Sequence, residues 1–491
     1  MPRSLPARAL LALSMLVGFV LRMSTALTDA GIYWPDEIYQ SFEPAHKLVF
    51  GYGVIPWEFI EGARTWVLPG LVALLLKLSS MFGGDSPTVY IPLVKSVFVL
   101  VSMVTVAGVY RLSQVINDDE SPGAELASAA AASVWALCAA SLYFAPRAMT
   151  ENASAATVVW GLALLLDKRS VGSRRLVVIG ASLLGLSVLF RLQCVVFCVG
   201  ILVILAMQSR KQVAAAASWK LVLAVLGGWA VFYGVLDAIT WHDAPNTRFG
   251  GLFHSVFVYV RFNLIEGQGA RWGTAPWQYY AKHLWSTMPA VTLVLAVASV
   301  VALRRTPGLV FTVVAFVAIH AAVAHKELRF LVPVLPVICA FVGWALFSAA
   351  RVPLLKIALP TTVGVSALSA YGASSLTMGD VGAYVDQRPA SSAWGDFANV
   401  NRLMIEAGKR DDLCGLRIDI AHLAWTGGST YVHRRVPLYM PGYPPDRGHF
   451  NYAIVWPGSG AEVVAKDNGI ELVRLPSVVC QPDPSYTWRL P

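Results

Sequence analysis

Apolar residues recur along this chain in runs that a water-soluble domain would not expose. A transmembrane helix needs about 20 apolar residues, and about 11 such runs lie before residue 376. They cover 9–27, 88–110, 122–144, 152–167, 174–190, 193–209, 218–239, 288–303, 308–324, 328–349 and 356–375. The pattern predicts an α-helical polytopic membrane protein with about 11 transmembrane helices.

The pattern changes after residue 375. Short β-like runs then alternate with turns rich in Pro and Gly. We expect strands at 415–420, 429–433, 452–456 and 470–474, and a helix at 393–408. The chain should therefore divide into a membrane domain over 1–375 and a small α/β soluble outer-face domain over 376–491.

Composition agrees with this division. The chain is 56% hydrophobic and 14% charged, whereas a soluble domain is about 25% charged. Much of the net charge of +9 comes from short loops between apolar runs, as the positive-inside rule predicts for cytoplasmic loops. Nucleic-acid binding would need Lys and Arg clustered on one soluble surface, so nucleic acid is not an expected partner.

A shorter apolar segment at 66–82 contains Pro69, Gly70 and Lys77. If it lies at the membrane interface without crossing, the basic loops all fall on the side of the N-terminus. Residues 28–87, the turn from Arg147 to Glu151, residues 240–287 and the C-terminal domain then lie outside. The expected location is a bacterial inner membrane with a periplasmic site, or the ER membrane in a eukaryote.

The first outer loop places Asp36 and Glu37 directly after Pro35, a residue suited to the first turn of a helix. The free N–H groups and dipole of a helix start stabilise carboxylates. An ionised Asp beside a membrane suits a general base for a sugar hydroxyl. The alternative is that both acids only cap a helix. Further candidate substrate-binding residues in this loop are Gln40, Glu43, Glu61 and Arg64.

Two clusters of ionisable residues lie between apolar runs. They comprise Arg191 and Gln193 in the first, and His325, Lys326, Glu327 and Arg329 in the second. Charges at membrane depth are costly unless they pair or face a cavity, and guanidinium groups bind phosphate oxygens bidentately. We expect the cations to bind a donor phosphate and Glu327 to orient one of them. Gln193 and Glu327 are also candidate substrate-binding residues. The alternatives are a snorkelling Arg191 and an ordinary charged turn at 325–329.

No Asp-x-Asp pair of the kind that holds a divalent metal occurs in the outer loops, and no Cys/His spacing fits zinc. We expect no metal and no cofactor, which agrees with a lipid monophosphate as the leaving group. Cys414 and Cys480 are the only cysteines of the polar region. An oxidising compartment would permit them to form a disulfide, although spacing leaves the pairing open.

Several stretches together resemble glycosyltransferase family 22, the membrane mannosyltransferases that build GPI anchors and dolichol-linked glycans. They are 35–46, Tyr52 with Gly53, 61–64, 191–193, 325–330 and 427–434. The resemblance implies a GT-C fold, a polyprenyl- or dolichyl-phosphate mannose donor, inversion and no required metal. It makes Asp36 the base, with Glu37 shaping the site. Trp34 stands where the family usually has a His.

The expected function is therefore inverting transfer of mannose from a lipid phosphate to a glycan or glycolipid acceptor on the outer face. Tyr431 and His433 are candidates to contact that acceptor. The compact loops and short polar domain are typical of a bacterial member. A pentose or aminosugar transferase on the same scaffold stays open, as does a transporter or flippase, although no paired repeats of the transporter kind are evident.

Overall fold

The computed structural model describes residues 5–32, 34–210, 218–349, 355–372, 397–441, 447–475 and 480–490. It contains two compact units. The helical unit comprises Met1–Ser24, Val97–His242 and Thr247–Ala390, and the sheet unit comprises Thr25–Ser96, Asp243–Asn246 and Ser391–Pro491. The expected domain boundary at 375/376 lies outside the described residues and stays a prediction.

Helices account for nearly all of the helical unit, which confirms the expected multi-span class. Four helical segments are long and apolar enough to cross a membrane among the residues described: Leu5–Thr28, Pro87–Asn117, Leu192–Arg210 and Trp219–Trp241. The number of spans stays a prediction. The helices of this unit are α1 (Leu5–Thr28), α5 (Pro87–Asn117), α6 (Pro122–Leu137), α7 (Ala139–Phe144), α8 (Thr150–Leu166), α9 (Arg174–Phe190), α10 (Val195–Arg210), α11 (Trp219–Trp241), α12 (His254–Val260), α13 (Tyr279–Thr287), α14 (Pro289–Ala302), α15 (Pro307–Ala322), α16 (Leu335–Ala349) and α17 (Leu355–Gly372). Residues 25–28 of α1 and 87–96 of α5 belong to the sheet unit.

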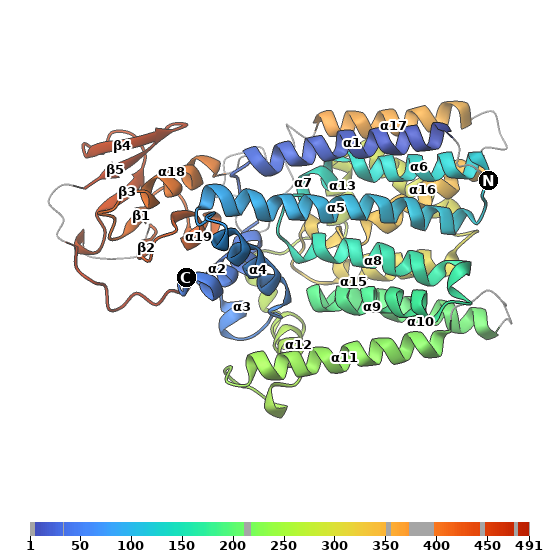
Figure 1. Ribbon diagram of the computed structural model, residues 1–491, viewed down its shortest axis with the longest axis horizontal. Helices are drawn as coiled ribbons and strands as arrows, with labels where there is room; N and C mark the ends of the chain where they lie inside the picture. The colour runs from blue at the N-terminus through green and yellow to red at the C-terminus, as the bar shows by residue number, and fades with distance from the viewer. Residues whose placement is uncertain are drawn as a thin grey trace. The chain divides into compact units, whose positions relative to one another are not determined.

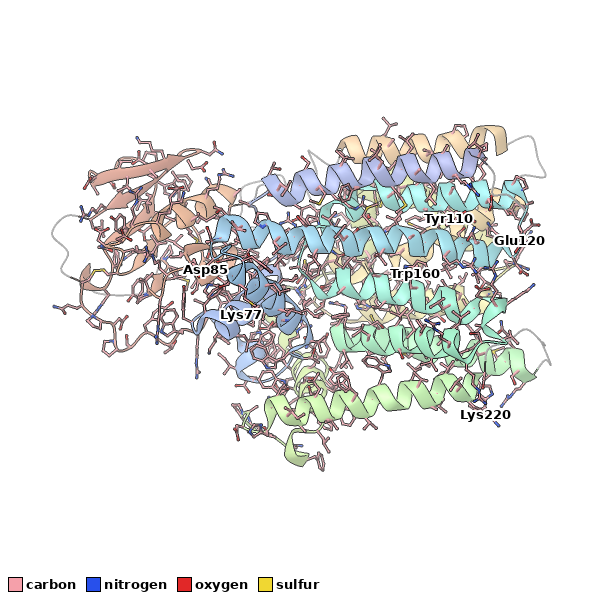
Figure 2. The ribbon with its side chains drawn as sticks, viewed as in Figure 1. Lys77, Asp85, Tyr110, Glu120, Trp160 and Lys220 are labelled. Atoms are coloured by element: carbon pink, nitrogen blue, oxygen red, sulfur yellow. A yellow bond between two sulfur atoms is a disulfide. The ribbon has the colours of Figure 1, made fainter. Side chains whose placement is uncertain are left out.

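Small residues allow the helices of this unit to pack closely, as is usual within membranes. Helices α8 and α9 run side by side (Figure 1), where Gly161 of α8 faces Leu184 of α9. Trp160, labelled in Figure 2, donates its indole N–H to the Val104 carbonyl of α5 at 2.8 Å. Such contacts satisfy polar groups that lipid cannot.

The expected span at 122–144 is interrupted: α6 ends at Leu137 and α7 begins at Ala139. The last carbonyls of a helix lack partners within it. Arg22 of α1, fully buried, donates to the carbonyls of Trp135 at 3.3 Å and Ala136 at 2.6 Å. A distant side chain therefore stabilises the break, which the apolar pattern alone could not reveal.

The sheet unit contains a five-stranded mixed sheet of order β2-β1-β3-β5-β4. Its strands are β1 (Leu416–Ile418), β2 (Leu438–Tyr439), β3 (Tyr452–Val455), β4 (Glu462–Asp467) and β5 (Ile470–Arg474). β1 pairs in parallel with β2 and β3, and β5 is antiparallel to β3 and β4. Helix α18 (Ala398–Gly408) packs on this sheet (Figure 1). The small α/β unit is confirmed.

The strand expected at 429–433 is wrong, because these residues form helix α19 (Gly428–Val432). Thr430 is β-branched and favours strands, but both its N–H and its hydroxyl donate to the Glu43 carboxylate, at 2.5 and 2.6 Å. Gly428 has a φ of 57°, which glycine adopts at little cost. Tertiary contacts thus override local propensity here.

The first loop also belongs to the sheet unit and is mostly helical. It contains a π-helical turn η1 (Ile38–Phe42), α2 (Glu43–Phe50), α3 (Trp57–Ile60) and α4 (Val67–Met81). Pro44 lies in the first turn of α2, where a proline is tolerated because its missing N–H has no partner within the helix. Helix α4 is formed by the apolar segment that the sequence placed at 66–82, and it packs on α2. Its 15 residues span about 22 Å, less than a hydrocarbon core of about 30 Å.

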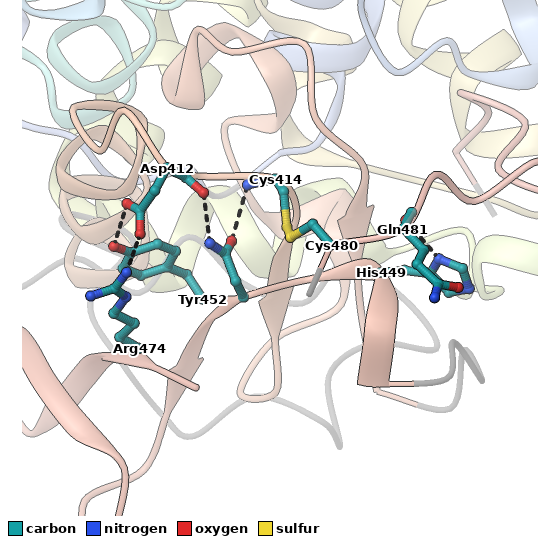
Figure 3. The surroundings of a disulfide bond; sticks show 8 residues. Asp412, Cys414, His449, Tyr452, Arg474, Cys480 and Gln481 are labelled. Carbon is teal, nitrogen blue, oxygen red and sulfur yellow. Dashed lines mark hydrogen bonds and ion pairs between the residues drawn. A yellow bond between two sulfur atoms is a disulfide. The ribbon is translucent and has the colours of Figure 1, made fainter. Parts of the chain in front are cut away.

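A disulfide joins Cys414 and Cys480, whose Cα atoms are 6.1 Å apart (Figure 3). Asn451, the residue before β3, accepts a hydrogen bond from the Cys414 N–H at 3.0 Å through its side-chain oxygen. Nearby, Asp412 accepts from Tyr452 at 2.8 Å (Figure 3). The disulfide attaches the C-terminal segment covalently, and β2 adds hydrogen bonds: the Leu438 N–H donates to the Tyr486 hydroxyl at 3.1 Å and the Tyr439 hydroxyl donates to Asp483 at 2.9 Å.

Candidate active site

Asp36 begins the helix that the sequence predicted after Pro35. The Glu37 N–H bonds the Trp34 carbonyl at 3.2 Å, and the Ile38 N–H bonds the Pro35 carbonyl at 3.0 Å. Trp34, the residue that departs from the family pattern, is 2% exposed. Asp36 is half-buried, whereas Glu37 is buried. The two neighbouring acids therefore occupy different environments.

Gln40 connects Asp36 to a second acid that the sequence did not single out. Its Nε2 donates both to Asp36 Oδ1 and, at 2.9 Å, to Glu58 Oε1. Burial raises the pKa of Glu58 to about 7; the Arg64 guanidinium opposes this rise and the Asp36 carboxylate adds to it. Because the two carboxylates share one donor, Gln40 links the raised pKa of Glu58 to the site of Asp36.

Glu37 faces a buried cation. Lys95 Nζ lies 4.0 Å from Glu37 Oε1 and donates to the Asp29 carbonyl at 2.8 Å. Both charged side chains are 2% exposed. Lys95 lies within the apolar run 88–110. The structure makes it the counter-ion of Glu37, which supports Glu37 as a residue that shapes the site.

Glu43 has its hydrogen-bonding capacity used within the protein. Its carboxylate accepts the Val54 N–H at 2.5 Å as well as the two Thr430 bonds. Burial raises the pKa of Glu43 to about 7, although these hydrogen bonds lower it in part. The residue ties the first loop to α19, which favours a structural role over the expected substrate contact.

His433 and Tyr431, expected to contact the acceptor, lie in this same packed region. His433 Nδ1 is 3.0 Å from His46 Nε2, and its Nε2 is 3.2 Å from Asp85 Oδ1. Figure 2 labels Asp85. Tyr431 is 1% exposed. Their surroundings support positioning of the first loop more than direct acceptor contact.

The helical unit holds a separate charged cluster, centred on Glu151. Its Oε1 accepts from Arg191 at 2.6 Å and from Arg329 at 2.8 Å, and all three side chains are buried. Both guanidinium groups lie over the Phe330 ring, at 4.8 and 5.0 Å from its centroid. The structure thus brings together two cations separated by more than a hundred residues, through the single acid Glu151.

Glu327 is the second anion of this cluster. It accepts from Arg329 Nε and, at 3.2 Å, from Arg329 Nη2, and its other contact is His325 Nε2 at 2.7 Å. Burial alone would raise the pKa of Glu327, but the adjoining Arg329 and His325 lower it to about 2. Glu327 is therefore ionised and orients Arg329.

His325 and Lys326 bind backbone carbonyls of the segment before α13. His325 Nδ1 lies 3.0 Å from the Gly273 oxygen, and Lys326 Nζ donates to the Ala275 oxygen at 2.7 Å. Lys326 also reaches the Val323 and Ala324 carbonyls. Since an ammonium has three donors, these contacts saturate Lys326 and favour a clamping role over phosphate binding.

The remaining predicted residues are Gln193, Glu61 and Arg64. Gln193 donates to the Tyr259 hydroxyl, and Glu61 and Arg64 are half-buried after α3. Among the described residues, no group of three or more His, Cys, Asp or Glu side chains could hold a metal ion.

Comparison with known proteins decides the family. Residues 13–379 match the Alg9-like mannosyltransferase family. The chain belongs to this family. This member is 28% identical over 326 residues to GPI mannosyltransferase 3 of Yarrowia lipolytica, covering 65% of this chain and 59% of the relative. It is 25% identical to human GPI alpha-1,2-mannosyltransferase 3, covering 68% and 57%. The matches thus span less than two thirds of these relatives.

Solved structures show the fold of this family member. ArnT from Cupriavidus metallidurans bound to undecaprenyl phosphate has a TM-score of 0.59 at 13% identity, covering 96% of this chain and 99% of ArnT. The Archaeoglobus fulgidus oligosaccharyltransferase AglB, in complex with an inhibitory peptide and a dolichol-phosphate, has a TM-score of 0.54 at 13% identity, covering 89% and 64%. The expected GT-C fold is confirmed.

Proposed function

We propose that this chain is an inverting mannosyltransferase. It moves mannose from a polyprenyl- or dolichyl-phosphate donor to a hydroxyl of a glycan or glycolipid acceptor at the outer or lumenal membrane face. The observation that carries the proposal is the contrast within the first loop. Glu37 and Glu43 are buried and paired or hydrogen-bonded, while Asp36 stays half-buried at the helix start.

Asp36 is the base in this proposal. Its carboxylate takes the proton of the acceptor hydroxyl as that oxygen attacks the anomeric carbon. The bond from this carbon to the phosphate oxygen breaks on the opposite face, and its electron pair stays with the lipid phosphate. One displacement of this kind inverts the anomeric configuration. Gln40 supports the reaction by holding the Asp36 carboxylate through its side-chain amide.

The leaving group gains negative charge, which preorganised cations stabilise most effectively. Arg191 and Arg329 are such cations, held by Glu151 and by the face of Phe330. They are the proposed sources of phosphate stabilisation. His325, Lys326 and Glu327 position the segment and Arg329, because their polar groups already bind within the protein.

The donor class has support from two sides. Curated relatives are named as GPI mannosyltransferases, and ArnT was solved with undecaprenyl phosphate. A disulfide suits an oxidising outer compartment, and the Cys414–Cys480 bond supports an outward sheet unit. For the acceptor, the proposal names a class, a hydroxyl group of a glycan or glycolipid.

The test is transfer by purified Asp36→Asn protein supplied with polyprenyl-phosphate mannose and membrane glycolipids, with products identified by mass spectrometry. General-base loss should lower the rate about 10²- to 10⁴-fold and leave donor binding intact. Glu120→Gln is the control, because this exposed acid (Figure 2) makes one peripheral ion pair with Arg169 at 3.6 Å. Unchanged transfer by Asp36→Asn would refute the role. Transfer from pentose or aminosugar donors in preference to mannose would replace the proposed substrate.

A further inference from the structure

The charged cluster of the helical unit has used most of its hydrogen-bond donors internally. Arg329 directs Nε and Nη2 to Glu327 and Nη1 to Glu151. Arg191 differs, because Nη1 binds Glu151 while its buried Nε–H has no hydrogen-bond partner in the part of the chain that the structure describes. A buried donor without a partner costs about 1–3 kcal/mol. A ligand that accepts the Arg191 Nε–H would remove this cost.

Tyr280 carries a second buried donor of this kind. Its side chain is 3% exposed, and its O–H donates to no acceptor within the described residues, although the Glu327 backbone N–H approaches the same oxygen. The charged groups that act on this hydroxyl are Arg191, Glu327 and Arg329. Burial raises the pKa of Tyr280, which keeps the phenol protonated and able to donate.

The position of Tyr280 is set by the contacts of the preceding segment. His325 and Lys326 bind the Gly273 and Ala275 carbonyls, and the Ala275 N–H donates to the Ala324 carbonyl at 3.0 Å. Helix α13, which carries Tyr280, then packs against the short helix η7 (Leu328–Leu331) that carries Arg329. The residues that sequence reasoning assigned to phosphate binding thus hold a neighbouring hydroxyl in place.

We propose that Tyr280 is a ligand of the donor phosphate and donates its phenolic O–H to one oxygen while Arg191 Nε–H donates to another. The inference rests on the proposed lipid-phosphate donor and adds a residue to its site. A tetrahedral oxyanion accepts both donors and gains from the nearby guanidinium charge. An apolar ligand would leave both donors unsatisfied.

The experiment measures binding of undecaprenyl phosphate and of undecaprenol to purified protein in detergent. The variants are Tyr280→Phe and Tyr279→Phe. Tyr279→Phe is a matched control, because it also removes one phenolic hydroxyl, at the neighbouring position of the same helix. The Tyr279 ring packs on His283, with the ring centroids 4.1 Å apart. Loss of a hydrogen bond to a charged group should weaken undecaprenyl phosphate binding about ten- to a hundredfold in Tyr280→Phe. Binding of undecaprenol should stay unchanged.

A second readout separates a ligand role from a structural one. Because this O–H donates to no acceptor in the part of the chain that the structure describes, Tyr280→Phe should leave the thermal unfolding midpoint of the ligand-free protein unchanged or raise it. Lower stability together with weakened undecaprenol binding would show a structural role and overturn the inference. Undecaprenyl phosphate affinity equal to that of Tyr279→Phe would overturn it as well.

Two further arms identify the source of the phosphate and keep the two proposals distinct. Inorganic phosphate competing as strongly as undecaprenyl phosphate would show a free-phosphate site and overturn the lipid assignment. Tyr280-dependent binding without any sugar transfer would support this inference and refute the transferase. Normal transfer with an unchanged donor KM in Tyr280→Phe would support the transferase and refute the role of Tyr280 as a phosphate ligand.

Discussion

Glu151 offers the sharpest test of the charged cluster, because one of its oxygens accepts from two guanidinium groups. Arg191 lies at 2.6 Å and Arg329 at 2.8 Å, and the side chain is 1% exposed. Glu151→Leu removes the acceptor and leaves two buried cations, of which Arg329 keeps Glu327. Removing one partner of a buried ion pair costs about 3–5 kcal/mol. Glu151→Gln keeps an acceptor oxygen and should cost less.

Asp118 provides a matched control. It also accepts from two cations, Lys168 at 2.6 Å and Arg305 at 3.1 Å, but its side chain is 31% exposed. Exposed pairs contribute about 0–1 kcal/mol each. Asp118 has a φ of 52°, a conformation that Asn tolerates. Asp118→Asn should therefore lose far less stability than Glu151→Leu.

The assay is denaturant unfolding of the purified proteins in micelles, with and without inorganic phosphate. Glu151→Leu leaves two guanidinium groups without their shared anion, so added phosphate that binds these cations in the folded state should restore part of the lost stability. Wild-type protein and Asp118→Asn should gain less. Equal losses in Glu151→Leu and Asp118→Asn would refute the reasoning that burial makes this pair strong, and an absence of phosphate rescue would refute phosphate binding by these cations.

Two other predictions concern the sheet unit. Because the pKa of Glu58 is raised from 4.5 to about 7, its contribution to stability is present below pH 4.5 and disappears as pH rises through 7, by at most about 3 kcal/mol. Glu58→Gln should make the fall in unfolding free energy between pH 5 and pH 8 shallower; an unchanged slope would contradict the raised pKa. Replacing Cys414 and Cys480 by Ser opens a loop whose ends are 66 residues apart, which should cost about 4 kcal/mol by loop entropy. Wild-type protein treated with reductant should match this variant, and an unfolding midpoint insensitive to both changes would contradict the prediction.

Properties that belong to one continuous segment could be predicted from the sequence. The apolar runs predicted the multi-span helical class, because lipid requires each spanning segment to satisfy its own backbone. Pro35 followed by Asp36 and Glu37 predicted a helix start, which the structure contains. The turn at 325–329 was recognised as unusual because a tight turn offers little water to its charges.

Side-chain partners that come from distant segments could not be predicted from the sequence. Asp36, Glu37 and Glu43 look equivalent along one helix, yet Glu37 meets Lys95 and Glu43 meets Thr430. The segment at 429–433 favours a strand locally, and the Glu43 contact makes it a helix. Periodicity describes which face a residue occupies but not which group lies opposite.

The sequence by itself determined that this protein is a polytopic membrane member of a mannosyltransferase family, since hydrophobic run length and local motifs are read along the chain. Only the tertiary structure decided how its charged residues divide their roles. Lys326 binds backbone carbonyls, Glu151 joins two arginines, and Tyr280 holds a buried donor beside them. Hydrogen-bond satisfaction depends on neighbours in space, and that dependence is the physical reason for the difference.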